Sequence, residues 1–224
     1  MFWRAAQFET RSRRIGLAWF ALTLASLVGL LEAGDQPVQR LISQSPWVAE
    51  HRLLIHAITD YGMYPFYLFF LGMLLAGWLG RNRAALTLSV GYLMAQLIGA
   101  VLTVRVLKIM TGHARPKAAG ANAGADWIGP TLDSAFHSFP SGHAADLFIS
   151  AIFIALLLPR GWLRGASLGF AAAVGLTRIA LAEHYPLDVI AGAFIGGAAS
   201  LLVIHWWVLP RLRRLEQAVT TPNR

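Results

Sequence analysis

The sequence contains no cysteine and little charge. Without cysteine the chain has no disulfide framework, no thiolate nucleophile and no zinc–thiolate site. Asp, Glu, Lys and Arg make up only 13% of the 224 residues, whereas about a quarter is usual for a soluble domain. The chain is instead 56% hydrophobic with a mean hydropathy of +0.54, which excludes a secreted globular enzyme and indicates that lipid solvates much of it.

Long uncharged stretches account for this composition. A bilayer core needs about 20 apolar helical residues, and 61–80, 84–104 and 189–209 each reach that length without a charge. We predict an all-α, polytopic membrane protein with six transmembrane helices, whose short loops leave room for only one domain, residues 1–224. The predicted spans are about 15–31, 61–80, 84–108, 142–159, 165–182 and 187–209.

The segments around the first span have two further features. A basic stretch, 11–14, precedes it, which is also the form of a signal peptide. We expect the span to stay attached, because Leu31-Glu32-Ala33 makes a poor cleavage site. Between Gln36 and Asp60, apolar and charged residues are interleaved, which predicts an amphipathic segment on the outer membrane surface.

The distribution of basic residues predicts the orientation. Twelve of the 19 Lys and Arg residues lie in the termini and in the loops around 81–83 and 160–164, and four lie in the other set of loops. Because cytoplasmic loops are enriched in Lys and Arg, we expect both termini to be cytoplasmic and the loops at 32–60, 105–141 and 178–188 to face outward. The net charge of +8 therefore reports topology, and we expect no nucleic-acid partner.

Polar residues of the types that take part in catalysis are predicted to lie together at the outward face. Lys108 ends the third span and Arg178 the fifth, while 140–143 opens the fourth and 185–188 the sixth. Ser at a helix start and Pro at the first helical position are N-terminal signals, and the exposed backbone N–H groups there favour an anion. Cations, two histidines and a carboxylate in one place favour phosphoryl transfer. Each cation taken alone is more typical of an interfacial anchor, and their convergence with two histidines is what favours a site.

Asp146 lies one turn into the fourth span, and an ionisable residue at that depth is a functional candidate. Two partners are open for it within the bundle, Arg105 and Arg178, and contact with an active-site histidine is a third alternative. The glycine pairs Gly165/Gly169 and Gly192/Gly196 are small-xxx-small patterns that predict close helix packing.

The outer segment 117–139 is the least regular part of the chain. Its Ala- and Gly-rich stretch Ala118–Ala125, followed by Trp127, predicts a flexible lid. The histidines and acids of the whole loop 111–141 have no fixed ligand spacing, so we predict no metal site; they are His113, Asp126, Asp133 and His137.

Three motifs follow one another in the second half of the chain. The first, Lys108–Pro116, has Lys, six residues, then Arg-Pro; the second, Pro140–His143, reads Pro-Ser-Gly-His. The third, Thr177–Asp188, has Thr-Arg, five residues, His, three residues, then Asp. In this order they resemble the signature of the type 2 phosphatidic acid phosphatase (PAP2) and vanadium haloperoxidase superfamily, from whose Ser-Arg the third motif departs only by Thr177, which keeps the hydroxyl. The resemblance implies a PAP2/haloperoxidase-like helical bundle as the core.

The resemblance also implies a role for each matching residue. His184 is the nucleophile and becomes a phosphohistidine, Asp188 fixes its tautomer, and His143 is the general acid. The residues that bind the substrate phosphate are Lys108, Arg115, Ser141, Gly142 through its backbone N–H, and Arg178. The family's chemistry requires no metal and no other cofactor. A neutral imidazole with an ordinary pKa of about 6.5 is suited to both histidine roles near neutral pH.

The function implied by the resemblance is a membrane lipid phosphatase of the bacterial inner (plasma) membrane, with its site facing the periplasm or exterior. Its partner would be a lipid phosphomonoester or terminal diphosphate in the outer leaflet: undecaprenyl diphosphate, phosphatidylglycerol phosphate, phosphatidic acid or lipid A 1-phosphate. The short chain without an accessory domain favours the first two. The alternatives are a lipid phosphotransferase with the same phosphohistidine and a lipid transporter, and the oligomeric state is left open.

Overall fold

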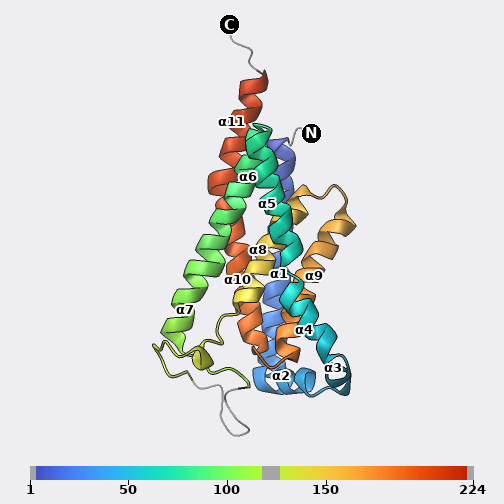
Figure 1. Ribbon diagram of the computed structural model, residues 1–224, viewed down its shortest axis with the longest axis vertical. Coiled ribbons are helices and arrows are strands. Elements are labelled where there is room, and N and C mark those ends of the chain that lie inside the picture. The colour runs from blue at the N-terminus through green and yellow to red at the C-terminus, as the bar shows by residue number, and fades with distance from the viewer. Residues whose placement is uncertain (1–3, 118–126, 221–224) are drawn as a thin grey trace.

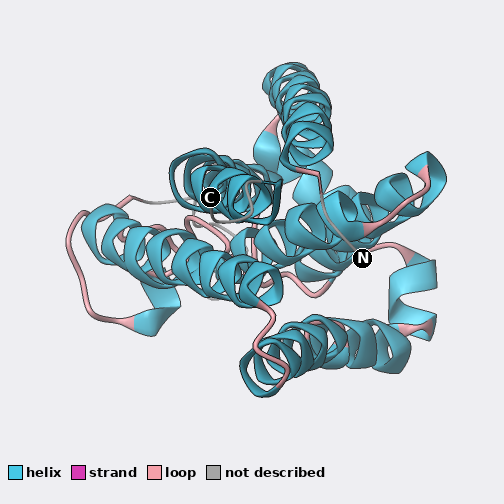
Figure 2. Ribbon diagram, turned by 90° about the horizontal axis from the view of Figure 1, so that it is seen from above, coloured by secondary structure: helices cyan, strands magenta, loops and turns pink. Residues whose placement is uncertain are grey.

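The computed structural model describes residues 4–117 and 127–220, and in these ranges the secondary structure is helical apart from two isolated bridges (Figure 2). The predicted lid, Ala118–Ala125, lies outside the described residues. The helices, in chain order, are α1 (Ala5–Ala33), α2 (Asp35–Ser43), α3 (Pro46–Glu50), α4 (Arg52–Tyr61), α5 (Tyr64–Leu79), α6 (Arg83–Ala95), the π-helical η1 (Gln96–Thr103), α7 (Val104–Thr111), the 3₁₀ turn η2 (Ser134–Phe136), α8 (Gly142–Leu157), α9 (Gly161–Ala180), α10 (Pro186–Val203), the π-helical η3 (Ile204–Val208) and α11 (Leu209–Thr220).

Long helical rods run side by side and form an elongated bundle (Figure 1). Four are long and apolar enough to cross a membrane: Ala5–Ala33, Arg52–Leu79, Arg83–Thr111 and Pro186–Val219. The two remaining predicted spans correspond to α8, an apolar helix of 16 residues, and α9, of 20 residues. The prediction of an all-α membrane protein is therefore confirmed, and both described chain ends lie at the same end of the bundle.

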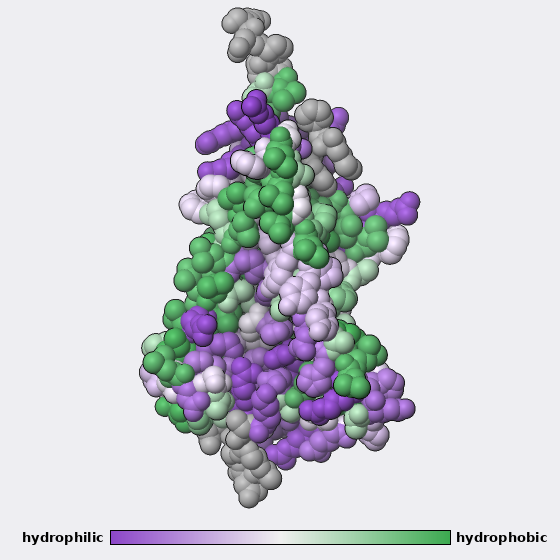
Figure 3. All heavy atoms as spheres, viewed as in Figure 1, coloured by the Kyte–Doolittle hydropathy of each residue, from purple (hydrophilic) through white to green (hydrophobic). Residues whose placement is uncertain are grey.

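Side chains on the outside of the bundle are apolar where lipid would surround them. Leu17 and Leu68 are 72% and 68% exposed, whereas the interior around α8 is closed. There Phe70 and Tyr92 stack with ring centroids 3.8 Å apart, and Phe153 of α8 meets both rings edge-on. Figure 3 shows apolar residues over the middle of one face and polar residues gathered at the end opposite the chain termini.

The segment between α1 and α5 is helical throughout. α2 and α3 lie at the end of the bundle away from the termini (Figure 1), and Leu187 N donates to the Asp35 carboxylate at 2.8 Å, which ties α2 to the first turn of α10. α4 continues into α5, so that this rod begins at Arg52, well before the predicted start at Tyr61. Only the first part of the predicted amphipathic segment is therefore separate from the second rod.

Asp146 lies in a polar network inside the bundle. Its carboxylate accepts hydrogen bonds from Tyr67 of α5, from Gln96 at 2.7 Å and from Ser150 at 3.4 Å. These neutral donors connect α5, η1 and α8, and within the described residues Asp146 pairs with none of the partners that the sequence suggested, two arginines and an active-site histidine.

The two predicted small-xxx-small pairs differ in the structure. A Cβ on Gly192 would lie 2.3 Å from Ser141 O, and one on Gly196 would lie 2.3 Å from Ala145 O, so this pair lets α10 approach the backbone of α8. On α9, nothing lies within 4 Å of a Cβ built at Gly165 or Gly169. The packing prediction is wrong for the α9 pair, because that face of α9 lines a cavity.

We predict that Gly196→Ala lowers the thermal unfolding temperature of the detergent-solubilised protein. The new methyl group would overlap Ala145 O, and overpacking of this kind costs about 1–3 kcal/mol. Gly165→Ala is the matched control, since an alanine in an uncrowded helix interior is favoured over glycine by roughly 0.5–1 kcal/mol. Equal unfolding temperatures for the two variants would contradict the close contact between α8 and α10.

Candidate active site

The residues that the motifs predicted all lie at the end of the bundle away from the chain termini (Figure 1). They are Lys108 on α7, Arg115 in the following loop, Ser141, Gly142 and His143 at the start of α8, Arg178 on α9, His184 in the next loop and Asp188 on α10. His143 is within electrostatic range of Lys108, Arg178 and His184, and Lys108 is within range of Arg115 and Asp188. The fold therefore brings together the side chains of three separate motifs.

Local helix-terminal signals position these groups. α7 ends at Gly112, whose φ of +55° turns the chain where a Cβ would lie 2.0 Å from Gly129 O. α8 begins after Ser141, whose hydroxyl accepts from Ala144 N at 3.4 Å, and α10 begins with Pro186. Ser141 N also donates to Asp188 O at 2.9 Å, so the first turns of α8 and α10 are joined.

Asp188 is a fully buried carboxylate at the start of α10. One oxygen, Oδ2, accepts from Ser138 Oγ at 2.5 Å and from Tyr185 N at 2.9 Å. The other oxygen, Oδ1, lies 3.1 Å from Nδ1 of His113, a ring that is itself 1% exposed. A carboxylate can be ionised in such a place only because hydrogen-bond donors and the helix N-terminus replace water.

His184 turns one ring nitrogen toward this carboxylate. Its Nδ1 is 3.5 Å from Asp188 Oδ2, too far for a good hydrogen bond, and has no other partner among the described residues. Nδ1 is thus the nitrogen that Asp188 can orient, which leaves Nε2 for bond formation. Burial lowers the pKa of the His184 imidazole to about 4, although the Asp188 carboxylate opposes this shift. The ring is therefore neutral near neutral pH.

Glu183, directly before His184, holds the basic residues of the site together. Its carboxylate accepts from Arg115 Nη1 at 2.8 Å and from Lys117, and lies 3.7 Å from Arg178 Nη2. Partial burial disfavours its charge, yet the hydrogen bond from Lys117 and the charges of Arg178 and Arg115 keep the pKa of Glu183 below its ordinary value. The carboxylate stands between guanidinium groups that would otherwise repel each other.

Lys108 reaches the same region from α7. Its Nζ donates to His137 O at 2.5 Å, so the loop before α8 fixes this cation through a backbone carbonyl. Lys108 and the two arginines present the kind of convergent cations that bind a phosphate group. Ser141 is fully buried with its oxygen in the helix cap, and its predicted part in phosphate binding stays a prediction.

Three residues that contact these groups were given no role in the site from the sequence, namely His113, Ser138 and Glu183. Glu183 could have been found as the acid adjacent to the predicted nucleophile. His113 lies inside the first motif, yet it is far in sequence from Asp188, and Ser138 precedes the second motif by only two positions. Their contacts depend on how the loop between α7 and α8 returns to α10, which no local pattern encodes.

The acids and histidines of segment 117–139 have other partners. Asp133 accepts from Ala135 N, and the His137 ring lies 3.0 Å from Thr131 O. Asp126 lies outside the described residues. Across residues 4–117 and 127–220, no group of three or more His, Asp or Glu side chains is placed to hold a metal ion.

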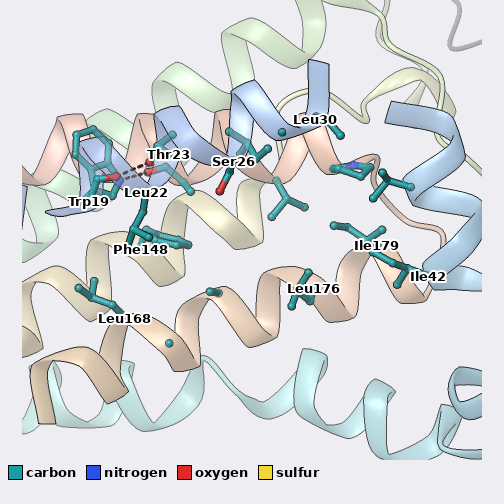
Figure 4. Close-up of a pocket in the computed structure, with 18 of the residues that line it drawn as sticks. Trp19, Leu22, Thr23, Ser26, Leu30, Ile42, Phe148, Leu168, Leu176 and Ile179 are labelled. Atoms are coloured by element: carbon teal, nitrogen blue, oxygen red, sulfur yellow. Dashed lines mark hydrogen bonds between the residues drawn. The ribbon is translucent and has the colours of Figure 1, made fainter. Parts of the chain in front are cut away.

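A cavity of about 720 Å³ lies away from these catalytic candidates, between α1 and α9 (Figure 4). Trp19 and Leu22 of α1 face Leu168 and Leu176 of α9 across it, and its walls are almost entirely apolar. Its lining residues Ile179 and Val189 pack on Ala144, the residue after His143. This apolar contact lies between the cavity and the polar site.

Comparison with known proteins agrees with the motif analysis. A model of the PAP2 superfamily matches residues 84–211, which include all the residues described for the site. The chain is 37% identical over 111 residues to a lipid A 1-phosphatase of Rhizobium etli, a match that covers 50% of this chain and 47% of that protein. The chain thus spans about half the length of this relative.

Two further proteins match a larger share. The bacitracin transport permease protein BcrC of Bacillus licheniformis is 32% identical over 174 residues, 75% of this chain and 76% of that protein. The crystal structure of Aquifex aeolicus LpxE superposes with a TM-score of 0.54 at 23% identity and covers 77% of this chain and 95% of that chain. The latter similarity shows the fold alone.

We predict that protonation of His184 destabilises the fold between about pH 6.5 and 4. The folded ring has a pKa of about 4 and the unfolded ring one of 6.5, so the unfolded state binds the proton first as the pH falls. The contribution of the neutral His184 ring to the free energy of unfolding is therefore complete above pH 6.5 and is lost as the pH falls toward 4. The unfolding temperature of the wild type should fall more steeply over this window than that of His184→Gln, which cannot titrate there; parallel curves would contradict the lowered pKa.

Proposed function

The chain belongs to the PAP2 superfamily, and from this premise we propose that it is a membrane lipid phosphatase that works through a phosphohistidine on His184. The observation that carries the proposal is the convergence of Lys108, Arg115 and Arg178 on a buried neutral imidazole backed by the Asp188 carboxylate. Three cations match the charge on the oxygens of a phosphate in its transition state, and the imidazole is the nucleophile beside them.

In the first step, the lone pair of His184 Nε2 attacks phosphorus. The N–P bond forms as the bond between phosphorus and the leaving oxygen breaks, and the leaving oxygen takes a proton from His143. Asp188 accepts the Nδ1–H of the ring, which becomes positively charged when its other nitrogen is phosphorylated. Lys108, Arg115 and Arg178 hold the phosphate oxygens throughout, which is the electrostatic part of catalysis.

In the second step, water attacks the phosphohistidine from the side of His143. His143, now neutral, takes a proton from the water, the N–P bond breaks, and inorganic phosphate leaves. His184 is returned neutral and His143 protonated, so the cycle balances. General acid–base help of this kind is typically worth about 10²- to 10⁴-fold in rate.

The position of the site supports a lipid as the substrate. The cations and histidines lie at the ends of apolar helices. A lipid's phosphate headgroup could reach them there while the hydrocarbon chains of the lipid stay in the bilayer. We propose the bacterial inner membrane as the location, with the termini cytoplasmic and the site facing the periplasm or exterior, since most basic residues lie at the opposite end. The lipid phosphatase named among the relatives supports this substrate class.

We predict that His184→Ala abolishes phosphate release from a lipid phosphate in detergent micelles, because the variant lacks the imidazole proposed to carry the phosphoryl group. Quenching the wild type with labelled substrate in alkaline denaturant should trap an acid-labile, base-stable phosphoprotein that the variant lacks. His205→Ala is the control: it removes an exposed histidine near the opposite end of the bundle. Phosphate release by a folded His184→Ala variant at the wild-type rate would overturn the mechanism.

We predict that lipid phosphates are hydrolysed with a kcat/KM far above that of a water-soluble phosphate such as glycerol 3-phosphate. The panel should hold undecaprenyl diphosphate, phosphatidylglycerol phosphate, phosphatidic acid and lipid A 1-phosphate, with phosphate release measured in micelles. The first two are favoured from the sequence, and the Rhizobium relative adds weight to the last. Similar kcat/KM values for lipid and soluble substrates would contradict a lipid phosphatase, and labelled phosphate on an added lipid instead of in water would identify a phosphotransferase.

A further inference from the structure

We infer that His113 is a positioning residue of the reaction: it holds the Asp188 carboxylate so that one carboxylate serves two imidazoles, His113 and His184. This inference rests on the proposed function, because it gives Asp188 the task of orienting the nucleophile. It concerns a residue outside the roles that the motifs imply. The two rings approach the same buried group from different parts of the chain, the loop after α7 and the loop before α10.

The hydrogen bonds of Asp188 divide unequally between its oxygens. Oδ2 has Ser138 Oγ, Tyr185 N and, at 3.5 Å, the nucleophile's Nδ1, whereas His113 Nδ1 is the side-chain partner found at Oδ1 among the described residues. The torsion that turns a carboxylate about its own axis is broad. Contacts on Oδ2 alone would not hold the carboxylate plane, and His113 supplies the contact at the other oxygen.

The His113 ring is itself held in place. It stacks on Trp127 with centroids 4.1 Å apart and planes inclined by 14°, and Tyr185 lies on it at 5.2 Å. Its own backbone O accepts from Ser138 N at 2.9 Å, so the two residues whose side chains contact Asp188 are also joined through their backbones. His113, Ser138 and Asp188 thus form one closed unit behind the nucleophile.

The protonation of the His113 ring follows from its partner. An ionised carboxylate only accepts hydrogen bonds, so His113 Nδ1 must carry the hydrogen that lies between them. The other nitrogen, Nε2, is buried with no partner among the described residues. An unpaired buried nitrogen is costly, which argues that this histidine is kept for the bond at Nδ1 and not for general packing.

The test compares His113→Ala with His113→Asn in the purified full-length protein. Ala removes the donor, and Asn places an amide N–H close to where Nδ1–H was. We expect Ala to lower kcat by about 10- to 100-fold, by analogy with the loss when the outer hydrogen-bond partner of a metal-ligating histidine is removed, with KM changed less than about twofold because no phosphate-binding residue is touched. Asn should restore most of kcat.

Two further measurements separate positioning from folding. In an Asp188→Asn background, His113→Ala should cause no additional loss of kcat, since the two residues act as one unit. His51→Ala is the matched control: His51 also stacks on a tryptophan, Trp47, at 4.5 Å, but it is only partly buried and its described contacts include none of the site residues. It should leave kcat unchanged. If neither His113 variant folds, ¹⁵N-histidine NMR of the wild type in micelles must show a hydrogen on His113 Nδ1.

The outcomes distinguish this inference from the proposed function. Equal kcat for His113→Ala and the wild type, equal loss in the Ala and Asn variants at equal unfolding temperatures, or a His113 ring without hydrogen on Nδ1 would overturn the positioning role while His184→Ala stays inactive. An active His184→Ala variant would instead overturn the phosphohistidine mechanism itself.

Discussion

The structure depends on keeping one carboxylate ionised at the edge of a membrane. Asp188 is fully buried, and an unpaired buried charge would be expensive enough to exclude the fold. The chain supplies donors from its loops, His113 and Ser138 from one side and the Tyr185 backbone from the start of α10. Ser141 N, bound to the Asp188 carbonyl, brings α8 to the same point. The loops at this end of the bundle thus supply the hydrogen bonds that keep the Asp188 carboxylate ionised.

In the same low-dielectric setting, the cations attract an anion strongly but also repel one another strongly. Arg115 and Arg178 are close enough to repel, and Glu183 lies between them as a counter-charge, while Lys108 is held by a backbone carbonyl. Such an arrangement holds the donors in one region of the structure, which would lower the reorganisation needed to bind the phosphate proposed above. Because burial also keeps His184 neutral, its imidazole adds no further positive charge beside these cations near neutral pH.

Close helix packing makes the arrangement precise. Gly192 lets α10 approach the α8 backbone beside Ser141, so the two helix starts that carry His143 and Asp188 cannot drift apart. On α9 the similar pair Gly165/Gly169 has no atom of the described chain within 4 Å of an added Cβ and borders an apolar cavity. Identical spacing therefore had two outcomes, because a small-residue pattern says that an approach is permitted and the opposing helix decides whether it occurs.

The sequence by itself determined the helical membrane class and the residues of the three motifs, because long apolar runs and fixed spacings are local properties of the chain. Only the tertiary structure decided the partners. Asp146 accepts from Tyr67 and Gln96 across the bundle, His113 meets Asp188 across 75 positions, and Glu183 joins cations from two motifs. Such contacts depend on which helix faces which, and hydrophobic burial and packing set that over the whole chain at once.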